Sequence, residues 1–204
     1  MKGLTYGLAV LATVACGLFS QDVDARSRKG AEATNLAASH PTTVASGRAI
    51  DVGFSPEGSA ETLVVKLIGT AKQSIRVSAY AFTSPRVVRA LIEAQRSGVD
   101  IKVVVDHKEN TSADHSGKAR AALNLLVEAG ITVRTNDRYA IHHDKFIVVD
   151  GAHVETGSFN YTDAAARRNS ENALVVWDAY DLAATYLAHW QSRFDAGQPF
   201  TATY

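Results

Sequence analysis

Five polar side chains within residues 141–175 have types and spacings suited to the cleavage of a phosphodiester. His143 and Lys145 are separated by one residue, as are Ser158 and Asn160, and Glu171 follows. A phosphodiester is an anion, so a nucleophile attacks it only where the growing negative charge is neutralised. Lys145 can supply a point charge, and Ser158 and Asn160 can donate hydrogen bonds. The set therefore predicts a site that binds and attacks phosphate.

His143 is the candidate nucleophile of this set. An imidazole is a competent nucleophile at neutral pH when it is held as the neutral tautomer, and a carboxylate on its far nitrogen, such as that of Glu171, would do this. A second imidazole is then required to protonate the leaving oxygen. The chemistry therefore needs one more histidine than His143.

Side chains alternate between the two faces of a strand, and this alternation orients the motif. Residues 141–149 are predicted to form a strand. His143 and Lys145 then point the same way, whereas Asp144 and the neighbouring His142 point away from the site. His142 is therefore expected to be structural.

The rest of the motif is placed by a hairpin and a final strand. Asp150-Gly151 is a strong hairpin-turn signal, and a short strand at Val154–Thr156 follows it. Ser158 and Asn160 again share one face, and Glu171 opens the last strand.

The chain before this motif alternates between strand and helix patterns. Predicted strands are Ala49–Phe54, Ser74–Phe82, Val99–Asp106 and Ile131–Thr135, and predicted helices are Ala60–Lys72, a helix with Ser84 as N-cap and Gly98 as terminator, Ala119–Ala129 and the closing helix Ala179–Phe194. This order predicts a single α/β domain with a mixed β-sheet flanked by helices.

The N-terminal segment predicts export. Lys2 precedes an uncharged stretch rich in Leu, Ala and Val, which is typical of a secretory signal peptide over residues 1–25. Residues 26–48 are predicted to be a flexible linker, and residues 49–204 the folded domain. A retained anchor, a lipoprotein processing site at Cys16 and a buried helix are the alternatives for the first stretch. Removal of the signal leaves no cysteine and no stable membrane association, and we expect the mature chain in the periplasm or outside the cell.

The motif around His143 resembles a known signature. His143-x-Lys145-x4-Asp150, followed by Gly157-Ser158-x-Asn160 and Ser170-Glu171-Asn172, is similar to the HKD signature of the phospholipase D superfamily. The resemblance covers about residues 52–204. Within the superfamily the chain looks most like the small bacterial Nuc-type endonucleases, which are non-specific and periplasmic. The implied architecture is the α-β-α sandwich of that superfamily.

The resemblance implies a role for each matching residue. His143 would form a phosphohistidine intermediate, and Lys145 and Asn160 would bind the phosphate. Ser158 would support that pocket, Glu171 would orient the histidine of the site, and Asp150 would brace the turn. No metal or cofactor is implied, and the sequence offers no obvious metal-ligand cluster.

The resemblance also predicts an oligomeric state. Larger members of the superfamily carry two HKD motifs in one chain, whereas this chain carries one. The second histidine is therefore expected from another subunit of a homodimer whose active site is shared across a two-fold axis.

Nucleic acid is the expected substrate, and local positive charge would have to bind it. The chain has 21 basic and 21 acidic residues, so its formal net charge is zero. The net charge alone therefore does not indicate a nucleic-acid-binding protein. Arg167 and Arg168 could grip neighbouring phosphates or simply be solvated. A phospholipase D-type lipid phosphodiesterase and a non-catalytic nucleic-acid-binding dimer are the two alternatives to an endonuclease.

Overall fold

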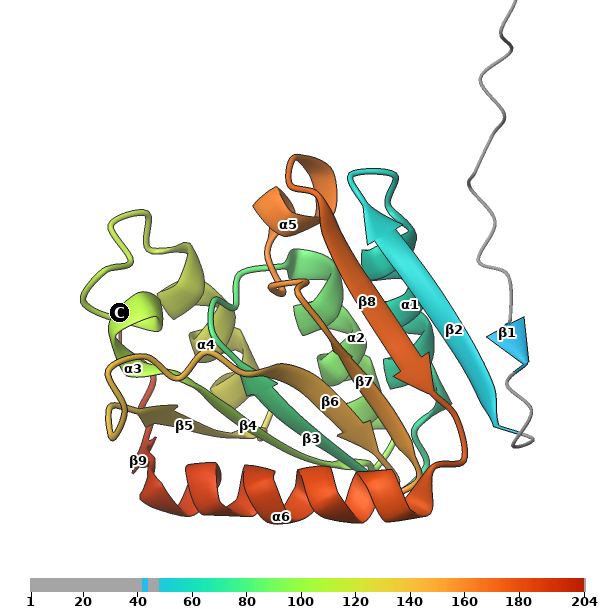
Figure 1. The fold of residues 1–204 in the computed structure, drawn as a ribbon. Coiled ribbons are helices and arrows are strands. Elements are labelled where there is room, and N and C mark those ends of the chain that lie inside the picture. The colour runs from blue at the N-terminus through green and yellow to red at the C-terminus, as the bar shows by residue number, and fades with distance from the viewer. Residues whose placement is uncertain (1–41, 44–47, 204) are drawn as a thin grey trace, which may run out of the picture. The chain divides into compact units, whose positions relative to one another are not determined.

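A computed structural model describes residues 42–43 and 48–203 of the chain. The strands are β1 (Thr42–Thr43), β2 (Ala49–Ser55), β3 (Ser74–Ala79), β4 (Asp100–Asp106), β5 (Thr132–Asn136), β6 (Lys145–Val149), β7 (His153–Gly157), β8 (Glu171–Val176) and β9 (Gln198–Pro199). The helices are α1 (Ser59–Thr70), α2 (Pro85–Arg96), α3 (His107–Asn110), α4 (Lys118–Glu128), α5 (Asp163–Arg167) and α6 (Tyr180–Ala196). The strands form one sheet in the order β1-β2-β8-β7-β6-β3-β4-β5-β9 (Figure 1).

The sheet is mixed, as predicted. Strands β3, β4 and β5 are parallel, and β6, β7, β8 and β2 follow one another in antiparallel pairs. Helices α2 and α4 provide the crossovers that parallel neighbours require. The connection between β6 and β7 is short instead: Asp150 and Gly151 have φ values of 54° and 61°, which is the backbone of a type I′ hairpin turn.

Helices cover both faces of the sheet, which confirms the predicted α/β class. Helices α1, α2 and α4 pack on one face around a large apolar cluster, and α6 lies along the other face (Figure 1). The second face has its own cluster, in which Trp190 and Phe194 of α6 pack against Val104, Phe146 and Val148. Burial from both sides explains why the central strands are almost continuously apolar.

The start of α2 matches its sequence signal. Ser84 is the N-cap and accepts a hydrogen bond from the backbone N–H of Val87, and Pro85 occupies the first helical turn. The hydroxyl of Ser84 also donates to the buried carboxylate of Glu61 at 2.6 Å, and Arg86 donates to the same carboxylate at 3.0 Å. These contacts fasten α2 to α1.

Two strands are shorter than their apolar patterns predict. Strand β3 ends at Ala79 because the side chain of Asn110 draws the next residues into a turn: it donates to the carbonyl of Tyr80 and accepts from the N–H of Phe82. Strand β6 begins at Lys145 instead of Ile141, because the backbone N–H of His142 donates to the carboxylate of Asp106 and leaves the ladder.

Most of the predicted N-terminal organisation lies outside the described residues. This holds for the signal peptide at residues 1–25 and for all of the predicted linker at 26–48 except Thr42, Thr43 and Arg48. Thr42 and Thr43 pair with the start of β2 in an antiparallel bridge. Among the helices of the described region, none combines the length and hydropathy that crossing a membrane requires.

Candidate active site

The sheet topology brings His143, Lys145, Ser158, Asn160 and Glu171 to one end of the central strands, here called the sheet edge. The carboxyl ends of parallel strands β3 and β4 lie at this edge, and β6 begins there because Lys145 pairs with Ala79 in antiparallel register. Strand β7 runs back to the same edge and ends at Gly157, where it pairs with Ala173 near the start of β8. The crevice beyond the carboxyl ends of the strands is where ligands bind in open α/β sheets.

Tyr80 lies in contact with both His143 and Lys145. The rings of Tyr80 and His143 meet edge to face, with centroids 4.7 Å apart and an interplanar angle of 64°. The ammonium nitrogen of Lys145 lies 5.3 Å from the centroid of the Tyr80 ring and donates to the carbonyl oxygen of His143 at 2.9 Å. The His143 side chain is exposed, whereas Lys145 is 9% exposed.

The surroundings of Lys145 set its charge behaviour. Burial lowers the pKa of the Lys145 amino group, while the nearby carboxylates of Glu171 and Asp144 raise it and only partly offset the burial. A cation with little water around it interacts more strongly with an anion than an exposed lysine does. Lys145 is therefore well placed to stabilise charge on a bound phosphate.

The residues that flank His143 point away from the site and hold its backbone. The ring of His142 is buried and its Nε2 lies 2.8 Å from the hydroxyl of Ser78. Burial lowers the pKa of His142. The carboxylate of Asp144 lies 2.9 Å from Nε2 of His189 on α6. Anchors on either side of His143 in the sequence, at His142 and Asp144, thus leave its own side chain exposed.

Ser158 and Glu171 lie next to each other across β7 and β8. The hydroxyl of Ser158 donates to the Glu171 carboxylate at 2.7 Å and accepts from the backbone N–H of Asn172 at 3.0 Å. Asn169 donates to the other oxygen of Glu171 at 2.9 Å. Gly157 permits this approach, because a Cβ at that position would lie 2.2 Å from the carbonyl oxygen of Asn172.

Glu171 does not bond to the histidine of its own chain. Within the described part of the chain, neither ring nitrogen of His143 has a hydrogen-bond partner, and Glu171 is held by Ser158 and Asn169. Its negative charge acts instead on Lys145. Orientation of a histidine by Glu171 therefore requires a side-chain movement or the His143 of a second copy.

Asn160 has an unsatisfied buried polar atom among the described residues. Its side-chain oxygen is buried and has no hydrogen-bond partner among the described residues, and the residue lines a cleft at the sheet edge. The backbone is fixed by Tyr161, whose carbonyl accepts from Thr83 and Ser84 at 2.8 Å each. Rotation of the Asn160 amide by half a turn exchanges its oxygen and its NH₂ group, so the side chain can either accept or donate at this position. Buried polar groups without a protein partner are typical of ligand sites.

Asp150 lies at the opposite end of β6, away from these residues. Its carboxylate accepts hydrogen bonds of 2.8 Å from the backbone N–H groups of Lys72, Gln73 and Ser74. Burial raises the pKa of Asp150, but these backbone hydrogen bonds lower it further, so that the pKa lies below its usual value. Asp150 thus ties the hairpin turn to the start of β3.

The two neighbouring arginines after Asn160 differ in position. Arg167 is ion-paired with Asp163 one helical turn earlier. Arg168 has no ion pair in the region that the structure describes, and it lines the cleft that Asn160 also lines. Only Arg168 is therefore positioned to meet a ligand in that cleft.

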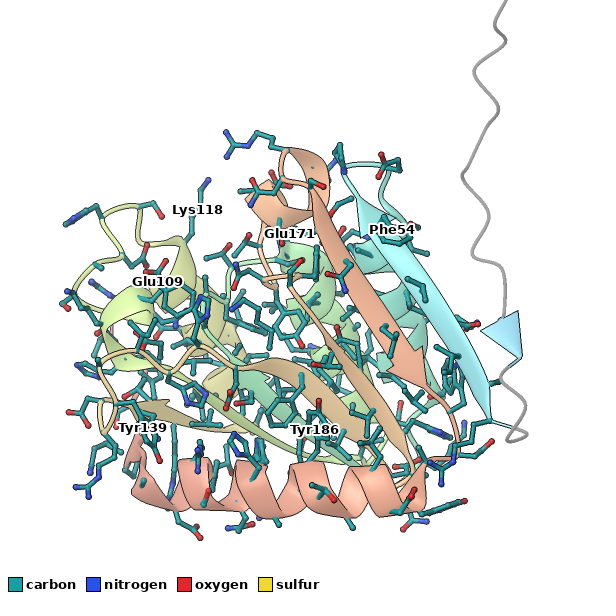
Figure 2. The ribbon with its side chains drawn as sticks, in the orientation of Figure 1. Phe54, Glu109, Lys118, Tyr139, Glu171 and Tyr186 are labelled. Atoms are coloured by element: carbon teal, nitrogen blue, oxygen red, sulfur yellow. The ribbon has the colours of Figure 1, made fainter. Side chains whose placement is uncertain are left out.

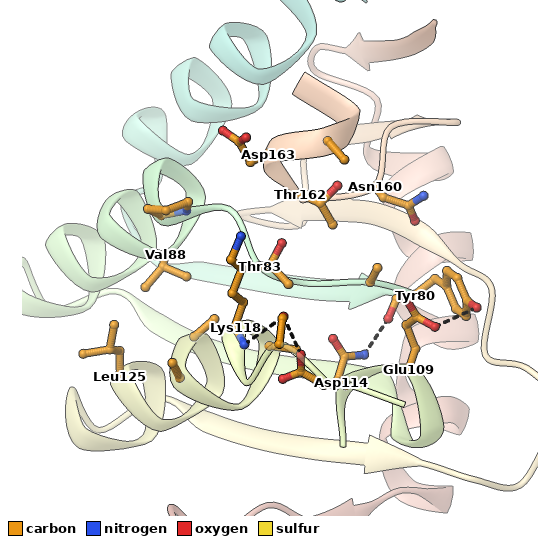
Figure 3. Close-up of a pocket in the computed structure, with 18 of the residues that line it drawn as sticks. Tyr80, Thr83, Val88, Glu109, Asp114, Lys118, Leu125, Asn160, Thr162 and Asp163 are labelled. Atoms are coloured by element: carbon orange, nitrogen blue, oxygen red, sulfur yellow. Dashed lines mark hydrogen bonds between the residues drawn. The ribbon is translucent and has the colours of Figure 1, made fainter. Parts of the chain in front are cut away.

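The cleft extends from Tyr80 and Asn160 along the helices of one face. Its volume is about 1140 Å³, and its walls come from α2, α4, α5 and the segment between α3 and α4 (Figure 3). Glu109 lies near its inner end and accepts a hydrogen bond of 3.0 Å from the hydroxyl of Tyr80. In Figure 2, Lys118 and Glu171 lie in the upper part of the molecule, and Glu109 lies below Lys118.

Sequence patterns did not single out Tyr80, Glu109 or the buried pair Glu155 and Tyr161. Glu155 is fully buried on β7 and accepts a hydrogen bond of 2.7 Å from the Tyr161 hydroxyl. The weak signal that could have found it is a charged residue within an otherwise apolar strand, since buried carboxyl groups are rare unless paired.

Comparison with known proteins gives the family. Residues 64–196 match the family model described as cardiolipin synthase, PLD-like domain. A phospholipase D of Rickettsia conorii is 30% identical over 94% of this chain and 95% of its own length. A phospholipase D of Rickettsia bellii is 38% identical over 69% of this chain, which spans 66% of that protein, just under two thirds.

A solved structure agrees with these matches. The phospholipase D family member Nuc from Salmonella typhimurium superimposes with a TM-score of 0.72 at 46% identity, over 75% of this chain and 98% of that one. The chain therefore belongs to the phospholipase D superfamily, and it is a phosphodiesterase of the PLD-like fold that is similar to Nuc.

Proposed function

We propose that this chain is a non-specific endonuclease that cleaves DNA, RNA or both through a phosphohistidine intermediate. The observation that carries the proposal is the exposed His143 ring above the buried Lys145, at an open edge of the sheet. An endonuclease must accept a phosphate from the middle of a polymer, so the site has to be open along the path of the chain. A site enclosed on all sides would exclude such a substrate.

The proposed reaction has two steps and needs two histidines. In the first, Nε2 or Nδ1 of His143 attacks phosphorus, a P–N bond forms, the P–O bond to one nucleotide breaks, and a second imidazolium gives its proton to the leaving oxygen. In the second, that imidazole takes a proton from water, water attacks phosphorus, and the P–N bond breaks. Lys145 and Asn160 bind the non-bridging oxygens in both steps.

The second imidazole is the reason for proposing a homodimer. His143 has no ring hydrogen-bond partner in the described region, and the carboxylate of Glu171 is held by Ser158 at the same edge. Two copies related by a two-fold axis at this edge would place two His143 rings on opposite sides of one phosphate. Nucleic acid is then the substrate partner, and the periplasm or the exterior is the proposed location.

Cleavage assays with a chelator test this proposal. Purified protein in EDTA is expected to nick plasmid DNA, degrade RNA and hydrolyse a chromogenic phosphodiester, and His143→Ala is expected to lose all three activities. His153→Ala, at the far end of the hairpin, is the matched control and should keep them. Turnover by His143→Ala at the wild-type rate, or binding of nucleic acid by the wild type without cleavage, would overturn the proposal.

A lipid phosphodiesterase is the second candidate function. The observation that favours it is that the Rickettsia relatives are named phospholipase D. Phosphatidylcholine and cardiolipin vesicles added to the same assay distinguish the two functions. Hydrolysis of the vesicles together with intact plasmid and RNA would replace the endonuclease proposal by the lipid one.

A further inference from the structure

The buried carboxylate of Asp106 bonds to two parts of the chain that are far apart in sequence. Asp106 is the last residue of β4 and is 3% exposed. Its Oδ1 accepts a hydrogen bond from the backbone N–H of Glu109, and its Oδ2 accepts one from the backbone N–H of His142, each at 2.7 Å. No step of the proposed reaction uses this carboxylate, although it bonds to the residue next to His143.

The bond from Oδ2 fixes the chain immediately before His143. The backbone N–H of His142 is held by Asp106, and the ring of His142 is held at 2.8 Å from the hydroxyl of Ser78. Each residue has only two soft backbone dihedrals, so a residue that is held at both its backbone and its side chain restricts where the next residue lies. The position of His143 therefore depends on the bond between Asp106 and His142.

The bond from Oδ1 begins the short helix that holds Tyr80. Asp106 is the N-cap of α3, and this helix supplies two contacts to Tyr80. Glu109 accepts the Tyr80 hydroxyl at 3.0 Å (Figure 3), and the amide of Asn110 donates to the Tyr80 carbonyl at 2.6 Å. The same amide donates to the carbonyl oxygen of Asp106 at 2.8 Å. Tyr80 is thus held at its backbone and at its hydroxyl, and its ring contacts that of His143.

Tyr80 and His142 are held as neutral groups. Burial raises the pKa of Tyr80, and the carboxylates of Glu109 and Asp106 raise it further, so the Tyr80 hydroxyl keeps its proton and remains a donor. Burial lowers the pKa of His142, and the nearby carboxylates offset this only in part. These two residues therefore act on their neighbours through position and not through charge.

We propose that Asp106 is a positioning residue for His143, which it holds through His142 on one side and through Tyr80 on the other. The two oxygens of one carboxylate thus act on one ring by two routes, one along the backbone and one through a ring contact. Asp106 is too deeply buried to meet a substrate, so it acts only through these neighbours. The inference rests on the proposed role of His143 as the nucleophile, and it adds the group that orients this nucleophile.

Helix capping alone does not explain a carboxylate at this position. Asn and Ser cap helices as well as Asp does, and each needs only one acceptor oxygen for this role. The second oxygen of Asp106 bonds to a backbone N–H 36 residues away, which is buried and would otherwise lack an acceptor. A side chain with a single acceptor can serve Glu109 or His142, but not both.

Substitutions that keep one acceptor test the proposal. Asp106→Asn and Asp106→Ser should each lower kcat on a chromogenic phosphodiester by about 10- to 100-fold, because one of the two routes to His143 is lost and small misplacements cost about this much. KM should change little, because Lys145 and Asn160 still bind the phosphate. Asp150→Asn is the matched control: it makes the same replacement in a carboxylate that accepts backbone hydrogen bonds at the opposite end of β6, and it should keep kcat near the wild-type value.

Combination with Tyr80→Leu tests whether the two residues act on the same ring. The double variant Tyr80→Leu plus Asp106→Asn is expected to lose clearly less activity than the product of the two single losses, because residues that act as a unit are not additive. Losses that multiply would overturn the inference. So would a wild-type kcat in folded Asp106→Asn, or equal losses of kcat in Asp106→Asn and Asp150→Asn.

Histidine NMR separates this inference from the proposed function. In protein labelled at the histidine rings, the His143 signal is assigned by its absence from His143→Ala. This signal is expected to shift or broaden in Asp106→Asn and to stay unchanged in Asp150→Asn. An unchanged signal in Asp106→Asn would refute the positioning role, whatever the activity. Absence of turnover by the wild type refutes the proposed function instead, while a shifted signal still shows that Asp106 holds the His143 ring.

Discussion

The ring of Tyr80 lies edge to face against the ring of His143, at a centroid distance of 4.7 Å. The same tyrosine is fixed at its other end, where its hydroxyl donates to Glu109 at 3.0 Å. A ring held at two points restricts the orientation of the exposed imidazole that it contacts. Tyr80 is therefore a positioning residue for the candidate nucleophile.

Removal of this ring is expected to lower the rate of the chemical step. Tyr80→Leu should reduce kcat on a chromogenic phosphodiester by about 10- to 100-fold, since small misplacements of a reacting group cost about this much. Tyr80→Phe keeps the ring contact and should stay within about threefold of wild type. A merely structural role would instead give both variants a lower melting temperature and an unchanged kcat in the folded fraction.

The buried acid Glu155 is expected to make the stability of the protein depend on pH. Burial raises the pKa of Glu155 to about 8, although the hydrogen bond from Tyr161 lowers it in part. The folded protein therefore keeps the proton while the unfolded chain, with a pKa of about 4.5, releases it. The contribution of Glu155 to the free energy of unfolding is fully present below pH ~4.5. It is lost as the pH rises to ~8, at up to about 1.4 kcal/mol per pH unit.

Urea denaturation between pH 5 and pH 8 tests whether the stability falls as the pH rises. The free energy of unfolding of the wild type should fall between pH 5 and pH 8 relative to that of Glu155→Gln, which keeps the size of the side chain and an acceptor for the Tyr161 hydroxyl but cannot ionise. Parallel curves for the two proteins would mean that Glu155 is ionised in the folded state.

The lowered pKa of Lys145 predicts the alkaline limit of activity. Burial lowers the pKa of this amino group below its usual 10.5, so the ammonium that binds phosphate is lost at lower pH than for an exposed lysine. We expect kcat/KM to fall as pH rises through this pKa. Lys145→Arg should have a lower rate at pH 7, because the guanidinium has a different shape. Its kcat/KM should fall only at higher pH than that of the wild type, because the guanidinium keeps its proton. If kcat/KM falls at the same alkaline pH in both proteins, the fall is caused by a group other than residue 145.

Asp150 is expected to matter for stability and little for chemistry. Asp150→Ala removes the acceptor of three backbone hydrogen bonds and should lower the free energy of unfolding by about 2–4 kcal/mol. Asp150→Asn keeps one acceptor oxygen and tolerates the positive φ, so its loss should be smaller. Both variants, assayed well below their melting temperatures, should keep kcat within about threefold of wild type. A large loss of kcat in stably folded Asp150→Asn would give Asp150 a catalytic role.

Patterns that act locally made the fold predictable from the sequence. Ser84 and Pro85 start α2 as expected, and Asp150-Gly151 forms the hairpin turn, because capping and turn chemistry depend on a few adjacent residues. The four-residue helix α3 was not predicted. Its N-cap is local, since the carboxylate of Asp106 accepts from the N–H of Glu109 at 2.7 Å, but a helix of this length also depends on distant contacts, such as those of Asn110 with Tyr80 and Phe82.

The active site, like the fold, could be predicted from the sequence only in part. The spacing of His143, Lys145, Ser158 and Asn160 predicts them on or beside neighbouring strands, and the structure brings them together at the start of β6 and the end of β7. The contact of Tyr80 with His143 depends on the register between β3 and β6, in which Ala79 lies opposite Lys145. Register between distant strands is set by the whole packed sheet, so a single sequence does not show it.

The activity of a mixed dimer tests the central claim most directly. Differently tagged wild-type and His143→Ala chains are co-expressed, the heterodimer is purified through both tags, and its cleavage of plasmid DNA in EDTA is compared with that of a doubly tagged wild-type dimer. A shared site that needs both His143 rings predicts less than about 1% of the wild-type rate, since loss of either the nucleophile or the acid stops the reaction. A heterodimer with half of the wild-type rate would show that each chain works alone and would contradict the account.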